Sequence, residues 1–377
     1  MADNPLKVLG TLGQSIWLDY IRRDLMESGE LKRMIEEDGL RGMTSNPAIF
    51  EKAIAESDEY EAEIRSMALL GKDPDAIYQA LSLEDVRSAA DEFRPLWDRM
   101  DGGDGYVSLE VSPHLAHDAA GTVEEGRRLW SQLDRPNVFI KVPATAEGLV
   151  AIRQLIDDGI SVNVTLLFGI SRYEQVVEAY LSGLEARASR GEPVKHVASV
   201  ASFFVSRIDA LVDPMLDKIA AQGGEKAALA KAAQGQVAIA SAKAAYQIQK
   251  KVFGDERFGK LAARGARIQR LLWASTSTKN PAYSDVKYVE ALIGPDTVDT
   301  APPETIDAYR DHGNPEVRLE EGLQESRAVL EHLPELGIRI DDVAMQLENE
   351  GVEKFKQPFD KLMATLAKSA PKYASHA

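Results

Sequence analysis

Short β-prone runs alternate with helical segments along the whole chain, and this alternation restricts the fold more than any other feature. Two of the helical segments, residues 27–39 and 147–159, end in a glycine, as many helices do. Strands that alternate with helices favour a parallel sheet with helical crossovers. We expect the strands within residues 15–21, 42–50, 105–111, 139–145, 161–168, 196–209, 270–281 and 296–304. The second should stop at Pro47, which cannot continue a central strand, and residues 196–209 include the exit from the sixth.

Eight strand–helix units in one chain predict a closed (β/α)8 TIM barrel, with a doubly wound open sheet as the main alternative. An open dinucleotide-binding sheet needs a glycine-rich turn after its first strand, whereas residues 22–30 are RRDLMESGE. The barrel is therefore favoured. We expect a single barrel domain over residues 1–377, with a helical layer around 210–268 and a C-terminal helical segment around 316–377.

Charge and composition narrow the class of function. The net charge of −16 argues against binding to nucleic acid or to an anionic membrane. The chain has no cysteine, which excludes disulfides, thiolate catalysis and cysteine metal sites. It contains no run of 18 apolar residues, and its start lacks the apolar core of a signal peptide. We expect a cytoplasmic protein.

The strand at residues 139–145, FIKVPAT, contains a lysine in an otherwise apolar run. Lysine rarely enters a core without a partner, so Lys141 either has a structural role or is a functional group. In a structural role it would snorkel from the strand end or form half of a buried ion pair. The functional interpretation is a nucleophile whose nitrogen attacks a carbonyl carbon to form a Schiff base. The residue alone does not decide between the two.

Polar residues near the ends of six predicted strands favour the functional interpretation. In a barrel, the carboxyl ends of the strands converge on one mouth, where active sites are built. Six polar side chains there, two acids and a lysine among them, are costly to bury without a task. They are Asp19, Asn46, Glu110, Lys141, Thr165 and Ser202.

Eight motifs follow one another along the chain: WLDYI, GMTSNPAIF, SLEVSP, IKVPAT, NVTLLF, ASFFVSRID, WASTSTKNPAYSD and TAPPETIDAYRDHG. Together they resemble the motifs of transaldolases of the longer bacterial type. The resemblance runs from about residue 10 to the C-terminal helix and implies a class I aldolase barrel without metal or cofactor. The implied reaction moves a dihydroxyacetone unit from sedoheptulose 7-phosphate to glyceraldehyde 3-phosphate, giving erythrose 4-phosphate and fructose 6-phosphate in the non-oxidative pentose phosphate pathway.

The resemblance assigns catalytic roles to four residues of this chain. Lys141 matches the lysine that forms the Schiff base, and Asp19 matches the base that takes the proton from the C4 hydroxyl. Glu110 and Thr165 match the pair that moves protons through a bound water.

It also assigns substrate-binding roles. Asn46 and Ser202 match residues that hydrogen-bond the dihydroxyacetone hydroxyls, Phe204 matches the pocket aromatic, and Arg207 matches the phosphate-binding arginine. Ser275 aligns with another phosphate ligand. Many family members carry an arginine two residues after this serine; here the spacing is longer, and Lys279 is the nearest cation.

Two other functions compete with transaldolase. One is a sugar-phosphate aldolase that releases free dihydroxyacetone. The other is a non-catalytic barrel that binds sugar phosphates, although loss of Lys141 or Glu110 would be expected in that case. Small sugar phosphates are the expected partners, and the protein is expected to be a monomer or a homodimer.

Four further residues carry weaker signals. His114 and His117 lie three apart but need a third ligand to hold a metal, so we do not assign them to one. Phe355 and Phe359 lie four apart on a predicted helix and are expected to be core contacts. The resemblance places that helix over the barrel mouth, where it could act as a lid. The segment Ser275–Thr278 is either a phosphate-binding loop or a plain loop.

Overall fold

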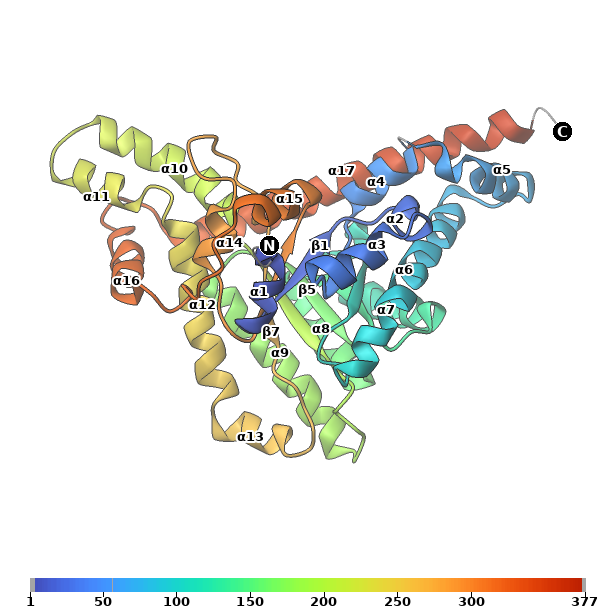
Figure 1. The fold of residues 1–377 in the computed structure, drawn as a ribbon, viewed down its shortest axis with the longest axis horizontal. Helices are drawn as coiled ribbons and strands as arrows, with labels where there is room; N and C mark the ends of the chain where they lie inside the picture. The colour runs from blue at the N-terminus through green and yellow to red at the C-terminus, as the bar shows by residue number, and fades with distance from the viewer. Residues whose placement is uncertain (1–3, 56, 375–377) are drawn as a thin grey trace.

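The computed structural model describes residues 4–55 and 57–374, and its strands form a closed, parallel (β/α)8 barrel in chain order (Figure 1). The predicted fold class is confirmed. All eight predicted strands are present, but each ends earlier than expected because the residues after it already enter a loop or a helix. The strands are β1 (Gln14–Asp19), β2 (Gly42–Thr44), β3 (Tyr106–Glu110), β4 (Val138–Pro143), β5 (Val162–Leu167), β6 (Ser199–Phe204), β7 (Arg270–Ala274) and β8 (Thr297–Ala301).

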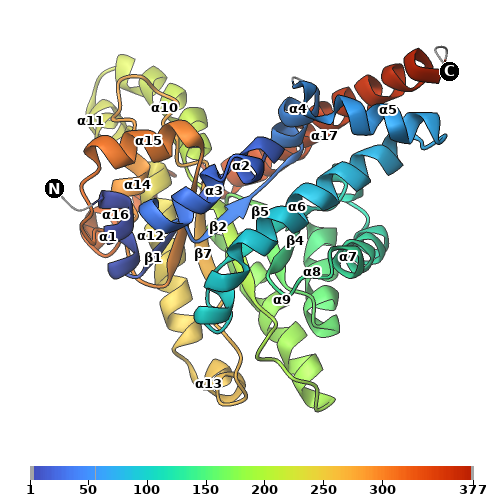
Figure 2. The ribbon, with the colours of Figure 1, turned by 45° about the vertical axis from the view of Figure 1, so that its right-hand side comes forward.

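Helices surround the barrel and add a layer on one side, as Figures 1 and 2 show. No helix in the described ranges is both long and apolar enough to span a bilayer. The helices are α1 (Pro5–Thr11), α2 (Arg23–Glu27), α3 (Glu30–Arg33), α4 (Pro47–Ala55), α5 (Glu61–Leu69), α6 (Pro74–Arg99), α7 (Ala119–Leu133), α8 (Ala146–Asp158), α9 (Ile170–Ser189), α10 (Ser206–Ala221), α11 (Glu225–Ala233), α12 (Val237–Phe253), α13 (Glu256–Ala262), α14 (Lys287–Ala291), α15 (Pro303–His312), α16 (Leu323–His332) and α17 (Ile340–Ala374).

The predicted helical regions are confirmed in outline and wrong in some boundaries. The helical layer around 210–268 consists of α10 to α13 and contains no strand. The region predicted as helical from residue 51 to 100 begins at Pro47 and is broken, because Asp73 caps a new helix by accepting a hydrogen bond from the Ala76 N–H. In the C-terminal segment, residues 316–322 form no helix, and residues 375–377 lie outside the described range.

The connection from β4 to α8 holds the end of β4, and with it Lys141, in place. The Thr145 hydroxyl accepts a hydrogen bond from the Gly148 N–H at 2.9 Å and so caps α8. A side chain at Gly148 would place its Cβ 1.9 Å from the carbonyl oxygen of Pro143, so only glycine permits this close approach. Gly159 then ends α8 in the left-handed conformation with a φ of 89°.

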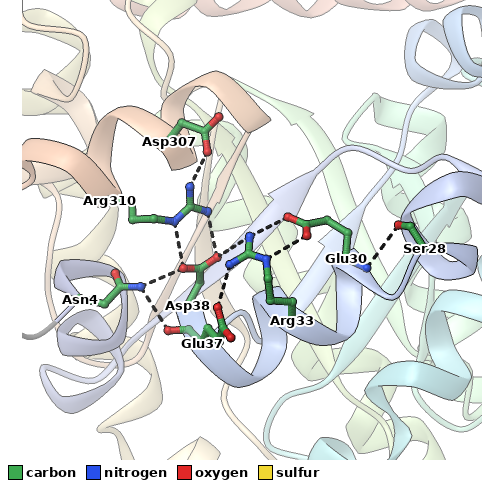
Figure 3. A network of polar contacts seen from close by, with 8 residues as sticks. All are labelled: Asn4, Ser28, Glu30, Arg33, Glu37, Asp38, Asp307 and Arg310. Atoms are coloured by element: carbon green, nitrogen blue, oxygen red, sulfur yellow. Dashed lines mark hydrogen bonds and ion pairs between the residues drawn. The ribbon is translucent and has the colours of Figure 1, made fainter.

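A network of polar side chains ties the last barrel helix to the first part of the chain (Figure 3). The buried carboxylate of Asp38 accepts hydrogen bonds from Arg310 on α15 at 2.9 and 2.8 Å and from Asn4 at 2.8 Å. Asp38 closes a π-helix, Met34–Asp38, that the sequence did not predict. The network lies beside the closure of the barrel, where β1 pairs with β8.

Helix α17 passes over the barrel and continues beside α4 and α5, as both ribbon views show (Figures 1 and 2). Phe355 and Phe359 on this helix are 5% and 7% exposed, so the predicted core contacts are confirmed. The Phe359 ring packs edge-on against Tyr78 at 5.4 Å, and Asp360 pairs with His114 at 2.7 Å. These contacts hold α17 across the carboxyl ends of the strands.

Candidate active site

A cavity of about 200 Å³ opens at the carboxyl ends of the barrel strands, and we call it the mouth cavity. Nine of the ten residues that the sequence assigned to the site line this cavity. The tenth, Glu110, lies next to it. The nine lining residues are Asp19, Asn46, Lys141, Thr165, Ser202, Phe204, Arg207, Ser275 and Lys279.

Lys141 is buried at the base of the mouth cavity, with only 4% of its surface exposed. Its Nζ donates a hydrogen bond to the carbonyl oxygen of Ser45 at 3.0 Å and lies 3.4 Å from Oε2 of Glu110. The ring of Phe355 lies on another side, with its centroid 5.7 Å from the nitrogen. The amine is therefore held at a fixed point that faces the cavity.

Glu110 is paired with Lys141 in the register of β3 and β4 and is 7% exposed. Neither of its carboxylate oxygens has a hydrogen-bond partner among the described residues. Burial raises the pKa of Glu110 to about 7, and the nearby Lys141 charge only partly opposes this rise. A carboxyl group with that pKa both donates and accepts protons near neutral pH.

Asp19 lies at the end of β1 and forms the acidic side of the mouth cavity. Its Oδ1 accepts a hydrogen bond from the Thr44 hydroxyl at 2.6 Å, and Thr44 in turn lies 2.7 Å from the hydroxyl of Thr300. Burial raises the pKa of Asp19, while the charge of Lys141 and the Thr44 hydrogen bond lower it in part. These contacts orient a carboxylate that suits a general base.

Asn46 and Ser202 present polar groups to the same cavity. The Asn46 side-chain oxygen accepts hydrogen bonds from the N–H groups of Ala48 and Ile49, at 3.0 and 3.1 Å, at the start of α4. Its amide nitrogen is consequently left as the donor for a ligand. Ser202 donates to Asn163 at 2.7 Å, so its oxygen remains an acceptor.

Thr165 is completely buried, and its hydroxyl has no hydrogen-bond partner among the described residues. The register between β5 and β6 shifts between Val164 and Leu167, which places a backbone irregularity at this threonine. Buried hydroxyls are nearly always satisfied, by protein or by water. An unsatisfied one in an active-site cavity suits a water or a substrate oxygen.

Two cations at the rim of the mouth cavity have no carboxylate partner in the part of the chain that the structure describes. Arg207, in the first turn of α10, makes no ion pair with the residues of 4–55 and 57–374, and burial lowers its pKa. Lys279 has an exposed side chain in a crowded loop, so desolvation and then the Arg207 charge lower its pKa. Its Nζ donates to the Ser277 hydroxyl at 2.6 Å. Two unpaired cations with serines beside them suit an anion such as phosphate.

Ser275 belongs to the same rim and begins the loop after β7. Its φ of 55° lies in the left-handed region, and its hydroxyl lies 3.0 Å from that of Ser206. The next residue, Thr276, donates to the buried Asp299 at 2.9 Å. Residues 275–278 form neither helix nor strand, and the loop is anchored to the barrel at this point.

Sequence reasoning did not assign several residues that line the mouth cavity. Thr300 could have been found, because it is the polar residue near the end of β8 and obeys the rule used for six other strands. Phe355 could not, because it reaches the cavity from a helix far along the chain. The lining residues that were missed are Thr44, Ala274, Ser277, Thr300, Pro302, Glu304 and Phe355.

The two histidines considered for metal binding point to different partners. His114 pairs with Asp360 at 2.7 Å, and His117 pairs with Glu147 at 3.2 Å. Among the residues that the structure describes, no group of three or more His, Cys, Asp or Glu is arranged to hold a metal ion.

Comparison with known proteins identifies the family of the chain. The sequence model of the transaldolase/fructose-6-phosphate aldolase family matches residues 16–366. The chain belongs to this family. It is 48% identical to a transaldolase of Trichodesmium erythraeum, over 99% of both chains. It is also 46% identical to a transaldolase of Thiobacillus denitrificans, over 96% of this chain and 99% of the relative. A Mycobacterium bovis transaldolase is 45% identical over 96% of each chain.

Proposed function

We propose that this protein is a transaldolase that moves a dihydroxyacetone unit from sedoheptulose 7-phosphate to glyceraldehyde 3-phosphate through a Schiff base on Lys141. The observation that carries the proposal is a buried amine at the base of a cavity whose rim holds Arg207 and Lys279, two cations that form no ion pair within the described ranges. Full-length relatives named transaldolase support the same reaction. The products, erythrose 4-phosphate and fructose 6-phosphate, place the reaction in the non-oxidative pentose phosphate pathway.

The first step forms the imine. The neutral amine of Lys141 attacks the C2 carbonyl of the ketose, and the resulting carbinolamine must lose its hydroxyl as water. The carboxyl group of Glu110, 3.4 Å from the amine, supplies the proton that makes water the leaving group. The Thr165 hydroxyl, which has no partner in the described protein, holds the water. The protonated imine then withdraws electrons from the adjacent carbon.

The second step breaks the bond between C3 and C4. Asp19 takes the proton of the C4 hydroxyl, the C4–O bond becomes a carbonyl, and the electron pair of the broken bond enters the imine to give an enamine. The Thr44 hydrogen bond at 2.6 Å fixes the carboxylate for this task. In the return direction, Asp19 gives the proton to the new hydroxyl after the acceptor aldehyde has reacted.

The phosphate group orients both sugars. Arg207 offers a planar pair of donors, and Lys279, Ser275 and Ser277 lie at the same rim. Binding at the phosphate fixes the reacting carbons over Lys141 and so turns remote binding energy into orientation. Asn46 and Ser202 hold the hydroxyls of the three-carbon unit.

Transfer, in preference to release, requires that the enamine is not protonated before the acceptor arrives. Phe204 lines the mouth cavity, packs against Phe168 at 5.0 Å and carries no exchangeable proton. An apolar wall at this point protects the enamine, which favours transaldolase over an aldolase that releases dihydroxyacetone. A non-catalytic barrel is disfavoured because both Lys141 and Glu110 are present.

Borohydride trapping tests the proposal. With fructose 6-phosphate and borohydride, we expect irreversible loss of activity and a stable adduct that peptide mapping locates on residue 141. Lys141→Arg keeps the charge but provides no nucleophile and should form no adduct. Lys243→Met is the control, because Lys243 is also buried but donates to the carbonyl oxygen of Glu321, outside the mouth cavity. An adduct on another lysine, or normal turnover by Lys141→Arg, would overturn the proposal.

We also propose a domain organisation, a cellular location and an oligomeric state for the protein. Residues 1–377 act as one barrel domain, located in the cytoplasm and present as a monomer or a homodimer. Light scattering after gel filtration measures the oligomeric state, and limited proteolysis that yields two stable fragments would contradict the single domain.

A further inference from the structure

A second, smaller cavity lies on the far side of Glu110 from the mouth cavity, between β3, α6, α7 and α17. We call it the rear cavity. Its volume of about 20 Å³ is enough for a single water molecule. Glu110, which is absent from the lining of the mouth cavity, borders the rear cavity. The other lining residues are Asp75, Tyr78, Gln79, Ser82, Leu109, Ser112, Glu125, Leu129 and Phe359.

The rear cavity is polar where it meets Glu110. Both oxygens of Glu110 are buried and lack hydrogen-bond partners among the described residues. A buried carboxylate without a partner is rare, and an ordered water is the usual explanation. Lys141 occupies one side of the carboxylate, so the rear cavity is the available place for a water that bonds to it.

Two further proton-carrying groups extend from the rear cavity towards the surface. Tyr78 on α6 lines it, and the charges of Glu110 and Glu125, after burial itself, raise the pKa of this phenol, so that it remains a hydroxyl donor. Glu125 on α7 accepts a hydrogen bond from the Ser112 N–H at 2.8 Å and pairs with Arg128 at 3.1 Å. Its side chain is 17% exposed, and Asp75 beside it is exposed.

We propose that Tyr78 and Glu125, together with water in the rear cavity, form a proton route that connects Glu110 with solvent from outside the barrel. This inference rests on the acid–base role of Glu110 in the proposed function. A bound sugar phosphate fills the mouth cavity, and α17 lies over it, so the front access of Glu110 to solvent closes during turnover. The rear route does not pass through the mouth cavity, because its residues lie on α6 and α7.

The proton balance shows what the route supplies. Lys141 and the ketone give a neutral carbinolamine without any net proton. Its C–O bond then breaks, the nitrogen lone pair forms the C=N bond, and Glu110 gives its proton to the departing oxygen. The products are a protonated imine, water and the carboxylate of Glu110. Hydrolysis of the product imine runs this step in reverse and returns the proton to Glu110, so a complete cycle consumes no proton. A proton from solvent is needed where Glu110 is a carboxylate when the sugar binds, and a pKa of about 7 makes this a large share of the molecules at neutral pH. The route through Tyr78 and Glu125 delivers that proton before imine formation.

Rapid-quench trapping of the imine tests the route. Fructose 6-phosphate at saturating concentration is mixed with the full chain, and borohydride stops the reaction at increasing times. Tyr78→Phe keeps the ring that packs against Phe50 and Phe359 and removes only the hydroxyl. Glu125→Gln keeps an acceptor for the Ser112 N–H. Direct proton transfer contributes about 10²- to 10⁴-fold, and we expect loss of the relay to slow trapping by about tenfold in each variant, with KM unchanged.

Tyr180→Phe is the matched control, because it removes a buried tyrosine hydroxyl that bonds the carbonyl oxygen of Arg267 at 2.8 Å, away from Glu110. We expect it to trap at the normal rate. Normal rates in Tyr78→Phe and Glu125→Gln would overturn the route, and so would an equal loss in Tyr180→Phe or a loss that appears only as a higher KM. If borohydride labels Lys141 and both variants trap at the normal rate, only the proton route is overturned and the proposed function stands. If Lys141 in the unaltered protein is not labelled, the proton route and the proposed function are both overturned.

Discussion

Nζ of Lys141 lies 3.4 Å from Oε2 of Glu110, and the two residues are 4% and 7% exposed. The register of β3 and β4 sets this pair, because the two residues are direct neighbours across the strands. Burial of the carboxyl group outweighs the attraction of the lysine charge and raises the pKa of Glu110 to about 7. The proposed nucleophile thus has beside it a group that is partly an acid and partly a base at neutral pH.

The pH dependence of imine formation should follow this pKa. Below about pH 7, Glu110 is mainly protonated and can expel the carbinolamine hydroxyl as water; above it, the acid is lost. Glu110→Gln should slow imine formation by about 10²- to 10³-fold near pH 6. At each pH, the rate of the unaltered protein is divided by the rate of Glu110→Gln. Other titrating groups affect both rates equally, so the ratio reports on Glu110 alone. Stopped-flow or rapid-quench trapping should show this ratio falling as pH rises through about 7, and a constant ratio would contradict the acid role.

Arg207 should control the selection of phosphorylated sugars. Removing a charge-assisted, bidentate contact costs about 1.5 to 3 kcal/mol, so Arg207→Gln should lower kcat/KM for fructose 6-phosphate about ten- to hundredfold. Activity towards unphosphorylated fructose should hardly change. Lys279→Gln should lower kcat/KM for fructose 6-phosphate less than Arg207→Gln does, because Lys279 is exposed. Steady-state kinetics with both sugars decide, and an equal loss with both would indicate a structural role for Arg207.

A second buried acid, Asp299, should make the free energy of unfolding depend on pH. This side chain is completely buried, Oδ2 has no partner among the described residues, and burial raises the pKa to about 7 from 3.8. The folded state therefore binds the proton more tightly than the unfolded state. The tighter binding of this proton contributes fully to the free energy of unfolding below the unfolded pKa of about 4. The contribution declines as pH rises and is lost above about pH 7.

Asp299→Asn removes this titration and keeps an acceptor for the Thr276 hydroxyl. The variant should match the unaltered protein near pH 4 and exceed it by about 2 to 4 kcal/mol at pH 8, because the cost of a buried charge is gone. Urea denaturation at a series of pH values measures the difference. If the variant were less stable at pH 8, the carboxylate would have a partner that these contacts do not include.

The barrel could be predicted from the sequence because the same residues mark the strand ends and the candidate site. Polar residues such as Asp19 and Lys141 interrupt apolar runs near the carboxyl ends of strands, and closure of the barrel brings those ends together. Closure itself followed from the count of strand–helix units. The strand ends were less well predicted, since Ser206 already begins a helix within residues 196–209, which were expected to contain the sixth strand and its exit.

Contacts between distant elements could not be predicted from local patterns. Phe355 reaches Lys141 only because α17 crosses the barrel, and Glu110 faces the rear cavity only because α6 and α7 pack with a gap there. No periodicity in the sequence reports either arrangement. The roles given to Asn46 and Ser202 followed from family resemblance, and the structure adds which of their atoms are already engaged in hydrogen bonds.

Phe204 should determine whether the enamine is transferred or released. The ring is 7% exposed, lines the mouth cavity and lies 5.6 Å from the guanidinium carbon of Arg207. Phe204→Tyr adds a hydroxyl, a proton donor, to this wall. Protonation of the enamine carbon followed by hydrolysis of the imine then yields free dihydroxyacetone.

We therefore expect Phe204→Tyr to raise cleavage of fructose 6-phosphate to dihydroxyacetone by about tenfold or more, since a positioned proton donor contributes at least that much. An enzymatic assay of dihydroxyacetone without acceptor measures release, and a coupled assay with erythrose 4-phosphate measures transfer. Phe168→Tyr is the control: Phe168 packs against Phe204 but does not line the mouth cavity. If Phe204→Tyr released no more dihydroxyacetone than Phe168→Tyr, the lifetime of the enamine would depend on exclusion of water by α17 and not on the missing proton donor.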